Sequence, residues 1–262
     1  MDATVIDLCA SVFDWARFRQ TKGAVKLHLL LGHDGYLPEY AVIPEGKRHE
    51  VRVAHQMRFT PGTMLVFDRG YTDYEWSRRL TRQHVHFMTR LKDNADYGVV
   101  EERELPRRKG VRRDQVIFYK QGREGKECFF RRVEFWDETQ NRLLVFLTNQ
   151  MTLSAATIAA VYKERWAIEL FFQGAQAVTS REDLRGNSAN ALKTQIWAAL
   201  IAMLLIKYLQ LRSTFSWSLS NLVALLRQQL FVYRDLWIWI DAPFQSPPQL
   251  EFMPPQLALS LA

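Results

Sequence analysis

The sequence predicts an α/β fold, and three features of its 262 residues support this prediction. The first 67 residues hold short apolar runs typical of strands, interrupted by one helical stretch. Residues 85–148 hold five more strand-like runs with turn signals between them. From residue 154 onward, apolar residues recur at helical spacing, which predicts an α-helical C-terminal third.

The N-terminal part is predicted to contain three antiparallel strands, a crossover helix and a fourth strand. The pair Asp34-Gly35 between two apolar runs is a hairpin signal. The fourth strand is wholly apolar, as is typical of a strand covered on both faces. This order is what a ribonuclease H-like core requires. The expected strands are 3–10, 26–31, 36–43 and 64–67, and the crossover helix is 49–57.

The strand-rich block that follows behaves as an insertion in this core, because helical patterns precede and follow it. Its expected strands are 85–91, 97–104, 114–120, 127–136 and 141–149. The expected helices are 73–83 before the block, and then 154–172 with Ser154 as its cap, 192–211 and 219–231. We therefore expect a mixed sheet with flanking helices, divided into a ribonuclease H-like core at 1–84 with 152–212, a β-rich insertion at 85–151, and a C-terminal helical segment and tail at 213–262.

The composition favours a polyanionic partner and an intracellular location. The chain carries 35 Lys and Arg against 28 Asp and Glu, which gives a net charge of +7. Cys9 and Cys128 lie far apart in no metal-ligand spacing, which is typical of a reducing compartment without a zinc site. The longest uninterrupted apolar run, 196–206, is shorter than the roughly 18 residues of a membrane span. We expect a soluble cytoplasmic protein that contacts no membrane.

Three acidic residues are candidates for phosphoryl-transfer chemistry. Such chemistry with two metal ions requires carboxylates from different elements that converge on one point. Asp2 lies on the first predicted strand, Asp68 directly follows the fourth, and Glu169 lies on the helix after the insertion. The alternative is that each is a solvated surface acid, which is the more common state of Asp and Glu.

Glu169 shares one helix face with a tyrosine and an arginine. Tyr162, Arg165 and Glu169 fall at i, i+3 and i+7, so they lie on the same side of a helix. An arginine there suits a phosphate backbone, because its guanidinium donates to two oxygens at once. A surface salt bridge with an aromatic anchor is the alternative, and Trp166 beside them is more often a core residue than a stacking platform.

These residues carry a resemblance to the insertion-sequence-four family of DDE transposases. The segment YKERWAIE at 162–169 resembles the family's Y-x2-R-x3-E signature, FDRG at 67–70 resembles its second-aspartate segment, and DATVIDL at 2–8 resembles its first-aspartate strand. The resemblance implies that Asp2, Asp68 and Glu169 hold two divalent metal ions, Mg²⁺ or Mn²⁺. It also implies DNA contacts by Tyr162 and Arg165, with Trp166 a weaker candidate.

The resemblance further implies partners and a reaction. The expected activity is metal-dependent DNA cleavage and strand transfer, with transposon ends and target DNA as partners. Paired ends would require a homodimer, and the expected location is the bacterial cytoplasm at the nucleoid. Two alternatives remain open: a non-catalytic DNA-binding remnant of a transposase, and a structural protein whose acids are surface groups.

The chain departs from the family pattern in two places. The signature continues with a lysine seven residues after its glutamate, where this chain has Gln176, and residues 173–187 lose the helical pattern. One hypothesis is a compensated frameshift, with one base gained near codon 173 and one lost near codon 187; a natural divergent loop is the alternative. Because the first acidic residue is Asp2, the resemblance also predicts an N-terminally truncated chain, and truncation together with a scrambled segment at 173–187 would make the chain inactive.

A basic loop is the remaining candidate for a DNA contact. Residues 103–113 carry six basic residues in eleven, among them Arg107, Arg108 and Lys109. Such a cluster predicts salt-sensitive contacts with phosphates that are independent of the DNA sequence. A solvated hairpin tip is the equally plausible alternative from the sequence alone.

Overall fold

The computed structural model describes residues 1–8, 17–19, 22–44, 50–105, 110–120, 128–178, 188–229 and 231–245. The chain divides into two compact units, 1–204 and 205–262. The predicted α/β class is confirmed, since the first unit combines two sheets with helices and the described part of the second is helical.

The first sheet of the N-terminal unit contains four antiparallel strands. Strand β3 (Lys22–Leu31) is its centre and pairs with β1 (Asp2–Leu8), β2 (Arg17–Arg19) and β4 (Pro38–Val42). The register places Asp2 opposite Leu29. The expected hairpin between β3 and β4 is confirmed, and its turn contains Gly35 at a φ of 72°, which suits a residue without a side chain.

The second sheet of this unit has six strands in the order β5-β6-β10-β9-β8-β7. Strand β5 (Met64–Val66) pairs in parallel with β6, whereas the later strands pair antiparallel. A 3-10 turn, η2 (Arg69–Tyr71), and helix α2 (Tyr74–Arg82) cross over from β5 to β6. The remaining strands are β6 (His86–Arg90), β7 (Tyr97–Glu102), β8 (Val111–Tyr119), β9 (Phe129–Asp137) and β10 (Arg142–Thr148).

Met1 links the two sheets. Its amino nitrogen donates to the Val66 carbonyl at 2.5 Å, and its own carbonyl accepts from the Asp68 amide at 3.3 Å. These two bonds are those of a parallel strand pair in which Met1 lies opposite Phe67. Strand β1 is therefore placed between β3 and β5 at its first residue.

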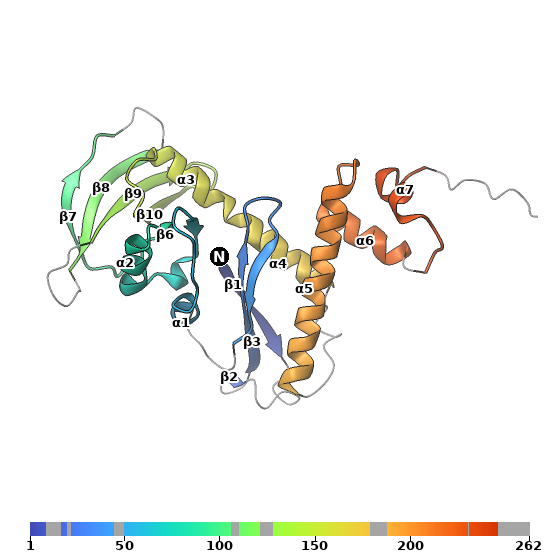
Figure 1. Cartoon of the computed structure of the whole chain (residues 1–262). Coiled ribbons are helices and arrows are strands. Elements are labelled where there is room, and N and C mark those ends of the chain that lie inside the picture. Colours follow the sequence, from blue (N-terminus) through green and yellow to red (C-terminus); the bar gives the residue numbers. More distant parts are fainter. Residues whose placement is uncertain are drawn as a thin grey trace, which may run out of the picture. The chain divides into compact units, whose positions relative to one another are not determined.

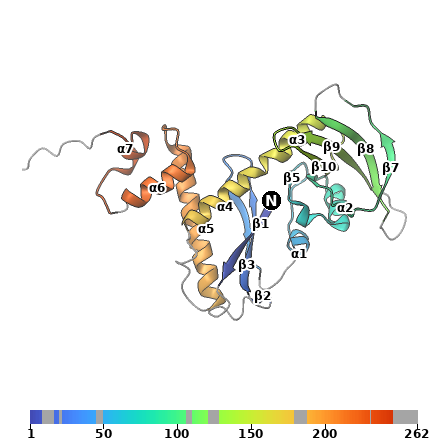
Figure 2. The ribbon, with the colours of Figure 1, turned by 180° about the vertical axis from the view of Figure 1, so that it is seen from behind.

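Two apolar cores fix this arrangement. Met1, Phe67 and Trp76 belong to one core, which also contains residues of helix α1 (Glu50–Ala54). The second core lies between helix α3 (Ala155–Glu164) and the six-stranded sheet, where Ile158 packs with Phe146. Figures 1 and 2 show α3 lying across one face of β9 and β10 and leading directly into α4 (Trp166–Val178).

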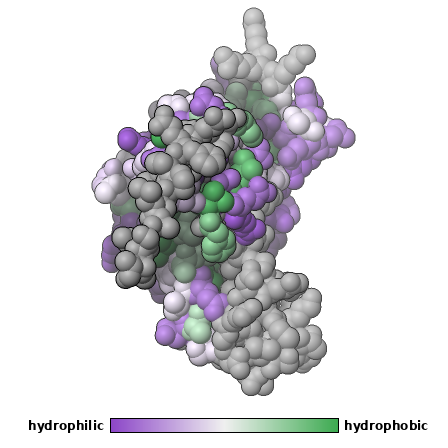
Figure 3. Space-filling view, turned by 90° about the vertical axis from the view of Figure 1, so that its right-hand side faces the viewer, coloured by the Kyte–Doolittle hydropathy of each residue, from purple (hydrophilic) through white to green (hydrophobic). Residues whose placement is uncertain are grey.

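Helix α5 (Ala189–Arg212) runs through the boundary between the units, and α6 (Leu219–Gln229) and α7 (Leu236–Asp241) follow it. A small core in the second unit joins Trp217, Leu222 and Trp239. Within the described part, α5 alone is long and apolar enough to cross a membrane by length and composition, and most of it is not buried. Figure 3 shows hydrophobic and hydrophilic side chains intermixed on the face that it draws.

The structure corrects several expected elements. The single helix predicted at 154–172 is two helices, because Arg165 and Ile168 each donate to a carbonyl three residues earlier and so tighten the chain at Arg165. Helix α4 then continues to Val178, beyond the point where the sequence pattern fades. Strand β2 and helix α7 were not predicted, because three and six residues are too few to show a period.

Candidate functional site

The pairing of β1 with β5 brings two of the predicted carboxylates together. Because Met1 lies opposite Phe67, Asp2 lies opposite Asp68. Side chains alternate along strands, so the buried Met1 and Phe67 side chains enter the core while both aspartates face the other side of the sheet. Each carboxylate is oriented locally: Asp2 accepts from the Ala3 amide at 2.8 Å, and Asp68 accepts from the Gly70 amide at 2.9 Å.

The junction of α3 and α4 brings Arg165 to these aspartates. Ser154 caps α3 by accepting from the Thr157 amide at 3.1 Å, and the packed face of α3 fixes the path of the helix over the sheet. At the tightened turn the Arg165 guanidinium donates to Asp2, and it also donates to Glu169 at 3.1 Å. One arginine thus joins carboxylates from two elements, β1 and α4.

The electrostatics of this cluster are set by burial. Burial raises the pKa of the Asp2 carboxyl, although the Arg165 guanidinium acts in the opposite direction, and the negative charge of Asp68 adds to the increase. The charges of Asp2, Asp68 and Glu169 all act on Arg165. The four groups therefore form one coupled cluster, which is the kind of environment that is concentrated at functional sites.

Tyr162 lies beneath the arginine. Its ring packs 5.0 Å from that of Phe146, and the Arg165 guanidinium carbon lies 5.5 Å from its ring centre. Burial raises the pKa of the Tyr162 phenol. Within the described residues its buried hydroxyl makes no hydrogen bond of acceptable geometry, and neither does Nε of Arg165. Both groups are buried, and the Arg165 guanidinium lies close enough to the phenol to act on its pKa.

Of the other predicted DNA contacts, Trp166 is the one that lies in the described part of the chain. Trp166 begins α4 and is 46% exposed, so it is neither the core residue that the sequence favoured nor part of the hydrogen-bonded cluster. Arg107, Arg108 and Lys109 lie outside the described residues, as do residues 179–187 of the anomalous stretch. The side chain of Gln176 is not described either. The hypotheses about Gln176 and about the stretch at 173–187 therefore stay predictions from the sequence.

The donor chemistry of the cluster suits a hard divalent cation, because three carboxylates supply oxygen ligands. Among the described residues, however, no three acidic, histidine or cysteine groups lie close enough to hold one ion. In this arrangement the Arg165 guanidinium bridges Asp2 and Glu169 and acts as their counter-ion. A bound ion would therefore compete with Arg165 for the same oxygens.

Two features of the site were not predicted from the sequence. Arg90, at the end of β6, acts electrostatically on Tyr162 and has a buried Nε without a partner in the described part of the chain. The sequence feature that could have indicated Arg90 is a basic residue at the end of an apolar strand. The second is a hydrogen bond of 2.6 Å between Tyr71 and His28, a residue of β3 that pairs with Ala3 of β1.

With this geometry in place, comparison with known proteins identifies the class. Residues 1–205 match the family model described as the transposase DDE domain, and the chain belongs to that family. Proteins of this family act on DNA and generally use divalent metal ions.

Three named relatives agree with this assignment. The chain is 31% identical over 212 residues to the probable transposase for insertion sequence element IS5377 of Geobacillus stearothermophilus. It is 25% identical over 252 residues to y4zB, a candidate transposase of Sinorhizobium fredii, and 26% identical over 217 residues to a candidate transposase for element IS4SA of Synechocystis. These alignments cover 80%, 95% and 80% of the chain, but 55%, 69% and 59% of the relatives.

Proposed function

We propose that this chain is the catalytic portion of a DNA transposase with Asp2, Asp68 and Glu169 as its three catalytic carboxylates. The observation that supports this most directly is their convergence: Asp2 and Asp68 lie on neighbouring strands, and Arg165 joins Asp2 to Glu169. The order β4-β3-β1 in one sheet, continued through Met1 to β5 and β6, supports a ribonuclease H-like core.

The proposed chemistry is cleavage and transfer of DNA strands by in-line displacement at a phosphodiester. Two divalent ions, Mg²⁺ or Mn²⁺, would activate the attacking hydroxyl and neutralise charge on the phosphate. Asp2, Asp68 and Glu169 would hold them. Arg165 and Tyr162 would bind the DNA backbone, because a guanidinium released from the carboxylates and a free phenol are donors for phosphate oxygens.

The other proposed contacts extend this surface. Trp166 is exposed next to Arg165 and can pack against a base or sugar. The basic residues Arg107, Arg108 and Lys109 would add contacts that are independent of the DNA sequence. We also propose that the partners are transposon ends and target DNA, that paired ends bring two chains together, and that the protein works in the cytoplasm at the nucleoid.

Metal-dependent cleavage of duplex DNA carrying the element's ends tests the proposal. The chain should cut with Mg²⁺ or Mn²⁺ and not with EDTA, and Asp68→Ala should reduce cutting at least about 10³-fold. Asp93→Ala is the matched control, because that carboxylate is exposed and lies outside the cluster. Equal cutting by the two variants would overturn the assignment.

One observation favours the alternative, a non-catalytic DNA-binding remnant. Arg165 bridges two of the three carboxylates, and no metal-ligand group forms among the described residues. A remnant would retain salt-dependent DNA binding but would show no cleavage with either metal ion. Absence of both cleavage and salt-dependent binding would instead support a purely structural protein.

A further inference from the structure

Two polar side chains of β3, Lys26 and His28, lie on the face of the sheet that is turned away from Asp2. The register pairs Asp2 with Leu29 and Ala3 with His28. Because side chains alternate along strands, Asp2 and His28 point to opposite faces, and Lys26, two residues before His28, shares the His28 face. The contacts of these two side chains therefore reach elements on the far side of the sheet from Asp2.

Each of the two side chains contacts a different element. Lys26 donates to the carboxylate of Glu50, the first residue of α1, and this pair is partly buried. His28 shares its hydrogen bond of 2.6 Å with the hydroxyl of Tyr71, the last residue of η2, and both residues are buried. The central strand of the first sheet is thus tied to α1 and to the turn that follows Asp68.

Glu50 and Tyr71 both lie close to the Asp68 carboxylate. The Gly70 amide donates to Oδ1 of Asp68, and a methyl group placed on Gly70 would lie 3.3 Å from that oxygen and 3.6 Å from Cγ of Glu50. The Tyr71 amide donates to the Asp68 carbonyl at 3.0 Å. Burial raises the pKa of the Tyr71 phenol, and the charges of Asp2, Glu50 and Asp68 add to the increase. The turn after Asp68 is therefore enclosed by the Glu50 and Tyr71 side chains.

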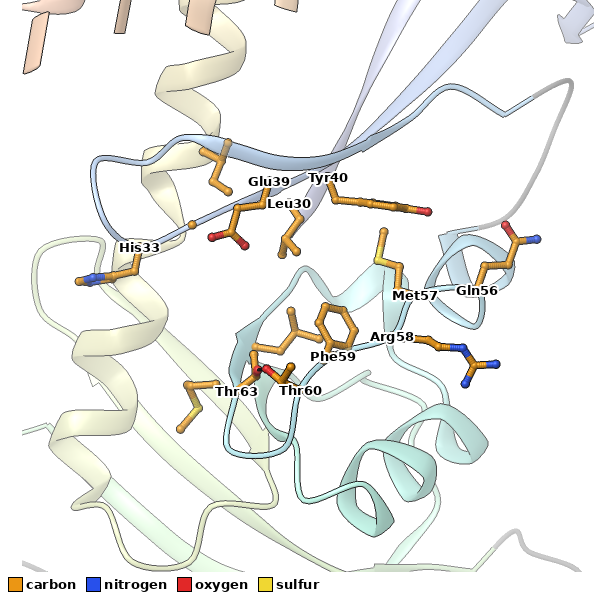
Figure 4. Close-up of a pocket in the computed structure, with 14 residues that line it drawn as sticks. Leu30, His33, Glu39, Tyr40, Gln56, Met57, Arg58, Phe59, Thr60 and Thr63 are labelled. Carbon is orange, nitrogen blue, oxygen red and sulfur yellow. Dashed lines mark hydrogen bonds between the residues drawn. The ribbon is translucent and has the colours of Figure 1, made fainter. Parts of the chain in front are cut away.

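Helix α1, which carries Glu50, is itself held in place. Ala54 and Met57 belong to the apolar core that also contains the end of β5 and the start of α2. Figure 4 shows the chain that leaves α1, with Met57 pointing into the hollow beside the hairpin and Arg58 pointing away from it. Glu50 is thus presented from a fixed element.

We propose that Glu50 and Tyr71, held by Lys26 and His28, are positioning residues that fix turn η2 and with it the Asp68 carboxylate. These roles rest on the proposed function, in which Asp68 holds a metal ion. A carboxylate binds an ion well only when its own backbone is held in place, and loss of such outer contacts typically weakens metal affinity about 10- to 100-fold.

Amide hydrogen exchange in the metal-free protein tests whether the turn is held. Tyr71→Phe removes the hydroxyl, and Glu50→Gln removes the charge that pairs with the lysine. Each variant should make the Gly70 amide exchange at least about 10-fold faster, because the turn opens more often. The Trp76 amide donates to Asp73 at 2.9 Å in a bond of the same kind, so it is the internal control and should change far less.

Binding of Mn²⁺, measured by titration calorimetry without DNA, separates positioning from stability. Tyr71→Phe and Glu50→Gln should each weaken it at least about 10-fold. The matched controls are Tyr119→Phe, whose ring packs on Tyr74, and Glu75→Gln, whose carboxylate is largely exposed on α2. Both controls should leave Mn²⁺ binding unchanged, even where they lower the midpoint of thermal unfolding.

The two measurements also distinguish failure of these roles from failure of the proposed function. Unchanged exchange at Gly70 in both variants would overturn the proposal. Faster exchange with unchanged Mn²⁺ binding would overturn it as well, because the contacts would then only stabilise the fold. A parent chain that neither binds Mn²⁺ nor cuts DNA would overturn the proposed function, while exchange at Gly70 would still decide whether Glu50 and Tyr71 hold the turn.

Discussion

The two ends of helix α3 are held by buried arginines in contrasting ways. Before its first turn, Arg131 of β9 donates to both carboxylate oxygens of Asp114, at 2.8 and 2.6 Å, and to the Leu153 carbonyl at 2.5 Å. After its last turn, Arg165 bonds Asp2 and Glu169 but leaves Nε without a partner in the described chain.

The two groups also differ in how far their side chains are exposed to solvent. The side chains of Arg131 and Asp114 are 3% and 4% exposed, whereas those of Arg165, Asp2 and Glu169 are 11%, 17% and 33% exposed. All the donor groups of Arg131 have partners, so its ion pair with Asp114 can only stabilise the fold. The more exposed cluster, which contains an Asp of raised pKa, retains the capacity to bind something else. Burial of charged groups alone therefore does not distinguish a binding site from a structural ion pair.

The largest effect on stability is expected from breaking the buried ion pair of Arg131 and Asp114. Arg131→Ala would leave Asp114 buried without a counter-ion and the Leu153 carbonyl without its donor, so the free energy of unfolding should fall by about 3 to 5 kcal/mol. Urea unfolding would measure this. Arg113→Ala is the control, because Arg113 is largely exposed and 3.8 Å from Glu134, and it should cost no more than about 1 kcal/mol. Equal losses of stability from the two variants would show that Arg131 contributes no more than a surface arginine does.

The next largest expected effect is a dependence of the unfolding free energy on pH that comes from His28. Burial lowers the pKa of His28 from 6.5 to about 4, and its Nε2 has no partner among the described residues. The folded state thus favours the neutral ring, so this stabilisation is complete above pH 6.5 and is lost as the pH falls toward 4. The loss should be on the order of 3 kcal/mol.

His28→Gln provides the comparison for that titration, since its side chain does not titrate. Urea unfolding between pH 7 and 4 should show a shallower decline for the variant than for the parent chain. Parallel curves would mean that groups other than His28 cause the acid sensitivity.

Sequence patterns predicted the elements that hold the aspartates but not the contacts between them. The apolar run before Asp68 and the alternating run from Asp2 onward were sufficient to place both at strand ends. The parallel pairing through Met1 was not predictable, because no short turn joins the two strands to fix their register and the bonds are made by one residue.

The split between α3 and α4 escaped prediction for a related reason. Apolar spacing continues through YKERWAIE, and a change from four-residue to three-residue hydrogen bonds at Arg165 hardly alters it. The sequence did place Tyr162, Arg165 and Glu169 on one face, and the bond from Arg165 to Glu169 agrees with that spacing. Arg90 was missed because its partner, Tyr162, is far away in the sequence.

The two clusters should respond in opposite directions when an aspartate is neutralised. Because burial raises the pKa of Asp2, its charged form is disfavoured in the folded state, and Asp2→Asn should raise the free energy of unfolding at pH 7.5 by up to about 1 kcal/mol. Asp114→Asn should lower it, because Arg131 loses its counter-ion.

Lowering the pH sharpens this comparison. As the Asp2 carboxyl becomes protonated, the parent chain approaches the state that asparagine imitates, so the gain from Asp2→Asn should shrink toward pH 4.5. Urea unfolding at both pH values measures the difference. A loss of stability from Asp2→Asn as large as that from Asp114→Asn would mean that both clusters are structural.

The smallest expected change in stability is at Tyr162, and it separates stability from function most directly. Its buried hydroxyl lacks a hydrogen bond of acceptable geometry within the described residues, so Tyr162→Phe should alter the free energy of unfolding by less than about 0.5 kcal/mol. If the hydroxyl donates to DNA, the variant should cleave or bind DNA roughly 10-fold less well, which is the loss of one hydrogen bond. Phe146→Leu, which changes the ring packed on Tyr162, is the control and should reduce stability while affecting the DNA step of folded protein less. An unchanged DNA step with Tyr162→Phe would assign Tyr162 to the core of α3 and leave Arg165 as the DNA contact of the pair.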